Sequence, residues 1–119
     1  MIEQTAFINR LYDRFNARDI EAVLAMLAPA VIWANGMEGG HVHGRDGVRN
    51  YWSRQWSTID PHVDPISISA QPSGTMIVEA RQVVRDLAGK ILADEMVGHL
   101  FALEDGLVTR FDIRDRSHG

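Results

Sequence analysis

The stretch MIVEARQVVRDLAGKILADEMVGHLFALEDGLVTRFDI, residues 76–113, decides the fold of this chain. In three runs, β-branched and other apolar residues alternate with polar ones, and a period of two is typical of strands. The segments LAGK (87–90) and EDG (104–106) separate the runs, and each carries the glycine that a tight turn favours. We therefore predict three long antiparallel strands joined by hairpins.

Helical periodicity dominates the first half of the chain. In AFINRLYDRFNARD (6–19), apolar residues recur every three or four positions and form one stripe. Asp19 is a suitable N-cap for a second helix, IEAVLAMLA (20–28), and Pro29 is predicted to end it. The segment RDGVRNYWSRQW (45–56) shows the same spacing and is predicted as a third helix.

Two further strands complete the prediction. VIWA (31–34) is a short strand, and the glycine-rich NGMEGGHVHG after it (35–44) is predicted to be a loop. HVDPISISAQ (62–71) has the period of two, and Pro65 within it indicates an edge strand or a bulge. Residues 1–119 then form one α+β domain, with three N-terminal helices packed on one face of a curled, mostly antiparallel sheet.

Length and composition limit the classes of function. A chain of 119 residues with 45% hydrophobic and 24% charged residues can bury its own core. The net charge of −4 argues against a nucleic-acid partner, which needs a basic stripe. The chain has no cysteine, which excludes disulfides, thiolate catalysis and cysteine-ligated zinc. It shows neither an apolar run of membrane-spanning length nor a secretory signal, so we expect a soluble cytoplasmic protein and no membrane contact.

Three segments, taken in order, resemble the nuclear transport factor 2-like superfamily: NARDIEAVLAMLAPAVIW (16–33), GRDGVRNYW (44–52) and HLFALEDGLVTRFDI (99–113). The SnoaL-like and ketosteroid-isomerase-like branches are the most similar. The resemblance covers nearly the whole chain and implies a cone, in which the bent sheet wraps a pocket that the helices close. It also implies a homodimer through the convex sheet face and, for many members, an enzyme that uses no cofactor.

Matching the turns to the family pattern implies a register for the sheet. One residue of slip, or one bulge, would invert the assignment of a strand's two faces. In this register His99, Arg110 and Asp112 face outward. The residues predicted to face the pocket are Glu79, Arg81, Val83, Met96, Gly98, Leu100, Thr109, Phe111 and Ile113.

The same register gives the pocket no ketosteroid-isomerase chemistry. That reaction needs a carboxylate base, with a tyrosine and a protonated aspartate that hydrogen-bond the oxyanion. The matching positions hold Asn35, Leu11 and Gly98, which supply neither the base nor the two donors. Asp112 is either a surface residue or, with a bulge, the acid–base group of a SnoaL-like cyclase. The alternation in TRFDI favours the surface position.

Glu79 and Arg81 are the predicted catalytic pair. Two residues apart on a strand, they point the same way and can interact. A partly buried carboxylate beside a guanidinium stays ionised and can orient a water or accept a proton, while the arginine can polarise a substrate oxygen. Limonene-epoxide-hydrolase-like members of the superfamily use a related pairing. The alternative is a half-exposed salt bridge that stabilises little.

The segment GGHVHG (39–44) carries two histidines on one side of an extended loop. His43 is predicted to reach over the pocket mouth as an acid–base group, and His41 to contact the substrate. The spacing can also bind a metal, with Glu38 as a third ligand, but no further ligand cluster is present and we predict no metal site. The alternative is a surface loop. His99 is assigned to the outer face, with a structural role.

Aromatic residues suit the walls of an apolar pocket with a few polar groups, although core packing would use the same residues. A small aromatic or apolar molecule fits such walls. The predicted substrate-binding residues are Phe15, Trp33, Asn35, Met37, His41, Trp52, Trp56, Val83, Met96, Leu100, Phe111 and Ile113.

The sequence thus favours a cofactor-independent enzyme of the isomerase, hydrolase, dehydratase or cyclase type, acting on such a molecule. Ketosteroid isomerase activity itself is not expected. A non-catalytic binding module with the same pocket and a dimeric scaffold are the alternatives.

Overall fold

A computed structural model describes residues 2–114, which contain three helices and six strands. The helices are α1 (Ile2–Asn16), α2 (Ile20–Leu24) and α3 (Gly44–Trp56). The strands are β1 (Leu27–Ala34), β2 (His41–His43), β3 (Ile59–Ala70), β4 (Thr75–Asp86), β5 (Ile91–Glu104) and β6 (Leu107–Arg114). The predicted α+β class is confirmed.

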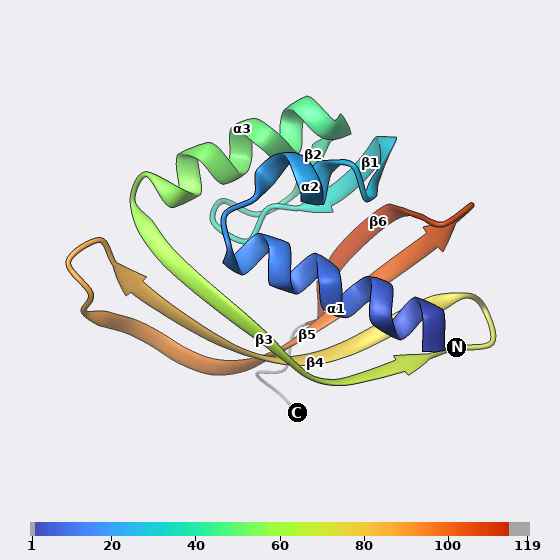
Figure 1. Cartoon of the computed structure of the whole chain (residues 1–119). Helices are drawn as coiled ribbons and strands as arrows, with labels where there is room; N and C mark the ends of the chain where they lie inside the picture. The colour runs from blue at the N-terminus through green and yellow to red at the C-terminus, as the bar shows by residue number, and fades with distance from the viewer. Residues whose placement is uncertain (1, 115–119) are drawn as a thin grey trace.

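The six strands form one sheet in the order β2-β1-β6-β5-β4-β3. β1 and β6 are parallel, and the other neighbouring pairs are antiparallel, as predicted. The long strands bend strongly, and α1 lies across their concave side while α3 lies above it (Figure 1). β3 is an edge strand, and its register shifts between Pro65 and Ser67, which confirms the interpretation of Pro65.

The second helix is shorter than predicted. It begins after Asp19, whose side chain accepts a hydrogen bond from the Ala22 N–H as an N-cap, but it ends at Leu24. Pro29 therefore lies inside β1, in a part of the strand where the register against β6 is irregular. Pairing with β6 and burial of apolar side chains outweigh the weak helix preference of so short a segment. The predicted 35–44 loop likewise contains a strand, β2.

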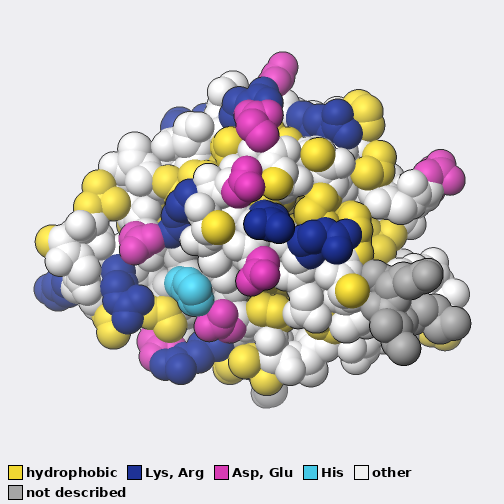
Figure 2. Space-filling view, in the orientation of Figure 1, with side chains coloured by type: hydrophobic (Ala, Val, Ile, Leu, Met, Phe, Trp, Pro, Cys, Tyr) yellow, Lys and Arg dark blue, Asp and Glu magenta, His cyan; other side chains and the backbone are white. Residues whose placement is uncertain are grey.

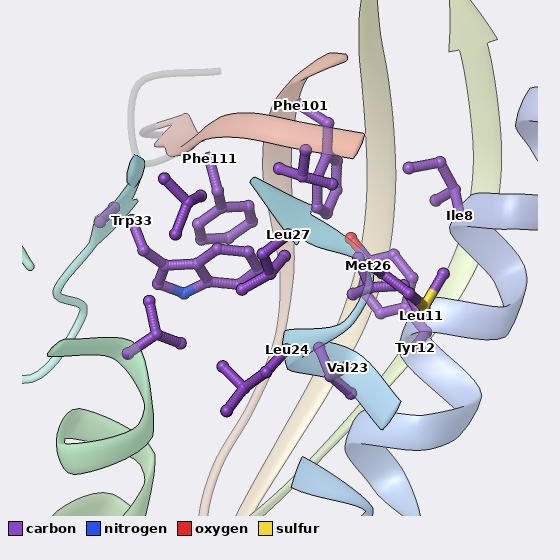
Figure 3. Close-up of a cluster of buried hydrophobic side chains, with 14 of the residues drawn as sticks. Ile8, Leu11, Tyr12, Val23, Leu24, Met26, Leu27, Trp33, Phe101 and Phe111 are labelled. Carbon is purple, nitrogen blue, oxygen red and sulfur yellow. The ribbon is translucent and has the colours of Figure 1, made fainter. Parts of the chain in front are cut away.

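The core lies between the helices and the concave face of the sheet (Figure 3). Ile8 and Leu11 of α1 pack toward the strands, where Phe101 and Phe111 are also buried. The ring of Trp33 stacks on that of Phe111, with centroids 4.1 Å apart and planes 18° apart. These aromatic contacts join β1, β5 and β6 beneath the helices, and stacked rings contribute beyond the area that they bury.

The register of β4 and β5 differs from the prediction. Met76, Val78 and Ala80 are buried in the core from β4, and their partners on β5 are Phe101, His99 and Val97. The concave face of these two strands thus carries the residues that the predicted register placed outside. The opposite face carries the side chains predicted to point inward, namely Glu79, Arg81, Val83, Met96 and Leu100.

A β-bulge explains this difference. Where β5 pairs with β6, Leu103 lies opposite Val108 while Ala102 lies opposite Arg110, so Thr109 is an additional residue on β6. In a regular hairpin counted from its turn, Thr109 would itself lie opposite Ala102, and no residue would be additional.

Beyond the bulge, Phe111 pairs with Phe101, whereas a regular hairpin would place Phe111 opposite Leu100. The predicted orientation of β6 is therefore right, because Phe111 and Ile113 both line the concave side. The orientations of β5 and β4 are wrong by one residue, because a shift of one position exchanges a strand's two faces.

Candidate functional site

A pocket of about 340 Å³ lies between the concave face of the sheet and helices α1 and α3. Its walls are mainly apolar and aromatic, and six polar side chains with titratable or amide groups interrupt them. The apolar walls include Leu11, Phe15, Trp33, Trp52, Val97 and Phe111. The six polar lining residues are Tyr12, Tyr51, Gln55, Gln82, Glu95 and His99. Such a composition is typical of a small-molecule site.

Packed aromatic rings make up one side of the pocket. Trp52 meets Trp33 edge to face at 5.2 Å and Phe15 at 5.4 Å between ring centroids. Trp56 packs behind this wall, stacked on Trp52 at 5.8 Å. Since the rings pack on one another, this aromatic wall suits an apolar or aromatic ligand.

Tyr12 and His99 form the most buried polar pair of the lining. The Tyr12 hydroxyl lies 2.6 Å from His99 Nδ1, and the two residues are 4% and 6% exposed. Tyr12 projects from α1 toward the sheet (Figure 3), and its ring plane is nearly parallel to that of the imidazole, with an interplanar angle of 7° and centroids 5.9 Å apart. The contact connects α1 to β5 across the pocket.

Burial fixes the protonation state of this pair. It lowers the pKa of His99 to about 4 and raises the pKa of Tyr12 above its ordinary value, so both groups are neutral near pH 7. The phenol is the stronger donor of the two neutral groups, and it therefore donates to Nδ1. The imidazole proton then resides on Nε2, which is the ring nitrogen left to contact a ligand.

This pair differs from the sequence-based prediction. The predicted register puts His99 on the outer face, and Tyr12 stands one position from the residue matched to the isomerase tyrosine. Phe101, two positions from His99, is the sequence feature that could have predicted the pair. It is a large aromatic residue, and its side chain is fully buried. An inward Phe101 requires an inward His99 on the same strand.

A second polar cluster lines the pocket from α3. The Tyr51 hydroxyl oxygen accepts hydrogen bonds from the Gly36 N–H at 3.0 Å and from Gln55 Nε2 at 3.2 Å. Burial raises the pKa of Tyr51. Gln55 Oε1 is buried and, among the residues described, has no hydrogen-bond partner. A buried acceptor without a donor costs stability.

The predicted catalytic pair lies on the other face of the sheet. The Arg81 side chain is 57% exposed, and its guanidinium donates to both carboxylate oxygens of Asp94 at 2.9 and 2.7 Å. These bonds raise the pKa of Arg81, and the hydrogen bond from Arg81 lowers the pKa of Asp94. Glu79 is half-buried on the same face. Neither Glu79 nor Arg81 lines the pocket.

The remaining predicted site residues divide into two groups. Six of them line the pocket, namely Phe15, Trp33, Met37, Trp52, Phe111 and Ile113. The others do not line it. Asn35 instead stabilises the loop after β1, where its Oδ1 accepts the N–H groups of Met37 and Glu38 and its Nδ2 donates to Glu38 Oε1. Trp56 belongs to the wall behind Trp52.

The loop histidines lie outside the pocket. His41 Nε2 is 2.8 Å from Asp112 Oδ1, and Arg110 Nε donates to Asp112 Oδ2 at 2.7 Å. The surface position of Asp112 is thus confirmed, and the hydrogen bond from Arg110 lowers the pKa of its carboxyl group. His43 is exposed at the start of α3. Within residues 2–114, no group of three or more His, Cys, Asp or Glu side chains could hold a metal ion.

Residues 8–111 match the family model of the SnoaL-like domain. The chain belongs to the SnoaL-like domain family. This membership confirms the predicted place in the nuclear transport factor 2-like superfamily, whose structures resemble the SnoaL-like domain in fold. No curated protein matches the sequence.

Solved structures resemble this SnoaL-like domain over nearly its whole length. An NTF2-like protein of unknown function from Burkholderia pseudomallei is 26% identical with a TM-score of 0.84, covering 96% of this chain and 91% of its own. TerC, co-crystallised with polyporic acid, is 24% identical with a TM-score of 0.82, covering 96% and 92%. RV0760c from Mycobacterium tuberculosis, in complex with estradiol-17beta-hemisuccinate, is 12% identical with a TM-score of 0.80, covering 96% and 94%.

Two surface properties bear on possible partners of the domain. Lys and Arg side chains are interspersed with Asp and Glu on the face drawn in Figure 2, and neither sign forms a stripe there. In the part of the chain that the structure describes, no helix is long and apolar enough to cross a membrane.

Proposed function

We propose that this SnoaL-like domain is a cofactor-independent enzyme of the isomerase or cyclase type that acts on a small, largely apolar molecule in the pocket. The observation that carries the proposal is the buried Tyr12–His99 pair, whose atoms lie 2.6 Å apart in an otherwise apolar cavity. A fixed hydrogen-bond donor in a water-poor site stabilises charge that develops on a substrate oxygen. The ligands of TerC and RV0760c support a small organic molecule as the ligand here.

Tyr12 and His99 act as one unit in this proposal. The Tyr12 hydroxyl holds His99 in the tautomer that carries a proton on Nε2. A substrate carbonyl oxygen accepts a hydrogen bond from Nε2–H, which polarises the carbonyl group, and the bond strengthens as negative charge develops on the oxygen. A neutral imidazole is suited to this task, because it donates without carrying a charge that would need a counter-ion in the pocket.

No catalytic step is assigned to Glu79, Arg81 or His43, because they lie away from the pocket. Non-catalytic binding is the second candidate function. Glu95 is the one carboxylate among the described lining residues, and it stands four positions from His99 on β5. Among the described lining residues, no carboxylate therefore lies directly beside His99 to act as a base. This arrangement favours the non-catalytic binding function.

The test is a panel of two- and three-ring enones, lactones and β-diketones, incubated with the purified protein and followed by absorbance and chromatography. We expect turnover of at least one compound, and a loss of about 100-fold in kcat/KM in the His99→Phe variant. Glu79→Gln, which removes a carboxylate from the other face of the same sheet, is the matched control and should retain full activity. Turnover that survives His99→Phe would contradict the proposal, and thermal stabilisation without product would favour the binder.

The proposal includes a homodimer through the outer face of the sheet. Val83, Met96 and Leu100 lie on that face beside the Arg81–Asp94 pair, and Met96 is 43% exposed. Apolar side chains framed by charged pairs are typical of an interface. Sedimentation velocity should give a dimer that dissociates on dilution, and a monomer at every concentration would contradict it. A dimer that neither binds nor converts any compound would support the scaffold alternative.

A further inference from the structure

The charge of the pocket is confined to one end. Glu95 is the only carboxylate in the described lining, which contains no lysine or arginine. Its partner across the strands is Gln82, which also lines the pocket. His99 is neutral near pH 7, because burial lowers its pKa to about 4. The single formal charge that a ligand meets in this lining is therefore negative.

Two arginines close to these elements, Arg18 and Arg81, are already engaged. The Arg18 guanidinium lies over the rings of Phe15 and Trp56, at 5.6 and 4.9 Å, and donates to the Asp60 carboxylate and to two backbone carbonyl oxygens. Arg81 lies on the outer face and donates to Asp94. Neither guanidinium lines the pocket, so neither offers a counter-ion to an anionic ligand inside it.

The distance between the two polar ends sets the size of the ligand. Glu95, Val97 and His99 alternate along the same face of β5, and all three line the pocket. Four residues of strand place the Cα atoms of Glu95 and His99 about 13 Å apart. Glu95 is solvent-exposed where it lines the pocket, whereas His99 is buried. A molecule that contacts both ends needs the length of two or three fused rings.

We propose that Glu95, together with Gln82, selects the second end of the ligand. The pocket prefers a neutral or cationic molecule of two or three fused rings, with an oxygen at His99 and a hydroxyl or ammonium group at Glu95, and it binds a molecule with a carboxylate at that position more weakly. An ionised glutamate accepts hydrogen bonds but donates none, and it repels a second carboxylate. This selectivity rests on the proposed function of the pocket and names its substrate class.

The test compares three probes that share one ring system and one hydroxyl group and differ only at the second end. They are 2,6-naphthalenediol, 6-(aminomethyl)-2-naphthol and 6-hydroxy-2-naphthoic acid, titrated calorimetrically at pH 7.5 and low salt. We expect the acid to bind the native protein about five- to tenfold more weakly than the diol, a modest factor because Glu95 is solvent-exposed. In Glu95→Gln the acid should approach the diol in affinity, and the amine should lose about fivefold. Glu79→Gln, with the same loss of charge on the opposite face of the sheet, should leave all three affinities unchanged.

The outcomes separate the selectivity from the pocket itself. Equal binding of acid and diol by the native protein, or an unchanged ratio in Glu95→Gln, would overturn the role of Glu95 while the diol still reports a working pocket. Binding of none of the three probes would overturn the ligand class and the proposed function of the pocket together. A ratio that Glu79→Gln changes as much as Glu95→Gln would attribute the effect to net charge alone and would also overturn the proposal.

Discussion

The Tyr12–His99 hydrogen bond can be tested by removing its two ends separately and together. Tyr12→Phe leaves the buried Nδ1 of His99 without a donor, and His99→Phe leaves the Tyr12 hydroxyl without an acceptor. The double variant Tyr12→Phe/His99→Phe removes both polar atoms at once. A phenylalanine at position 99 retains an aromatic ring among those of Tyr12, Phe101 and Phe111, so packing changes little.

The magnitude follows from the burial of the pair. A buried polar atom that loses its partner costs about 1–3 kcal/mol, whereas replacing both partners with apolar groups is close to neutral. Each single variant should therefore be destabilised by about 1–3 kcal/mol. For a domain of this size, we expect a fall in Tm of about 4 °C per kcal/mol. The double variant should lie within about 1 kcal/mol of the native protein, so the two single losses together exceed the loss in the double variant by a coupling energy of about 1–6 kcal/mol.

Urea and thermal unfolding of the four proteins, followed by circular dichroism, measure this cycle. The activity panel supplies the functional counterpart, since the double variant should be stable and yet as inactive as His99→Phe. Losses of stability that simply add in the double variant would refute the hydrogen bond, because two independent residues show no coupling.

Three further predictions concern acid stability, the α3 cluster and the outer face. The unfolded chain protonates His99 near its ordinary pKa of 6.5, and the folded chain only near a pKa of about 4. The contribution of neutral His99 to the free energy of unfolding should therefore be complete above pH 6.5 and fall by about 3 kcal/mol as the pH decreases to 4. Urea titrations at each pH measure this loss, and His99→Phe should lack it. Gln55→Met removes the buried Oε1 that lacks a partner and also the hydrogen bond from Gln55 Nε2 to the Tyr51 hydroxyl, so the two effects oppose each other and the Tm should stay within about 4 °C of the native value. A larger fall would contradict the unsatisfied acceptor. Arg81→Gln breaks an exposed ion pair, so the Tm should stay within about 2 °C of the native value and the catalytic activity should be unchanged. A loss of activity would show that Arg81 takes part in catalysis.

The architecture could be predicted from the sequence because it depends on local patterns. Helices α1 and α3 follow from apolar residues at helical spacing, and β4, β5 and β6 from a period of two between glycine turns. The edge position of β3 follows from Pro65. The end of α2 could not be predicted, because the stretch after Leu24 is drawn into pairing with β6, a strand about 80 residues later in the chain.

The candidate site could be predicted only in part, and Thr109 is the reason. The bulge at this residue brings Phe111 opposite Phe101, so that both rings join Trp33 in one buried aromatic cluster. The stabilisation from this cluster comes from tertiary packing, and no local sequence pattern around Thr109 predicts the bulge. The aromatic walls were predicted because their residues lie on elements with clear periodicity. The polar pair was not predicted, because one inserted residue reverses the orientation of His99.

The most direct test of this account is nitrogen NMR of the His99 ring in the native protein, from pH 4 to 8, with and without 2,6-naphthalenediol. We predict that the ring remains neutral with its proton on Nε2 down to about pH 5, and that the Nε2 resonance shifts when the diol is added. A ring that titrates near pH 6.5 and shows no response to the diol would contradict both the buried pair and its contact with a ligand.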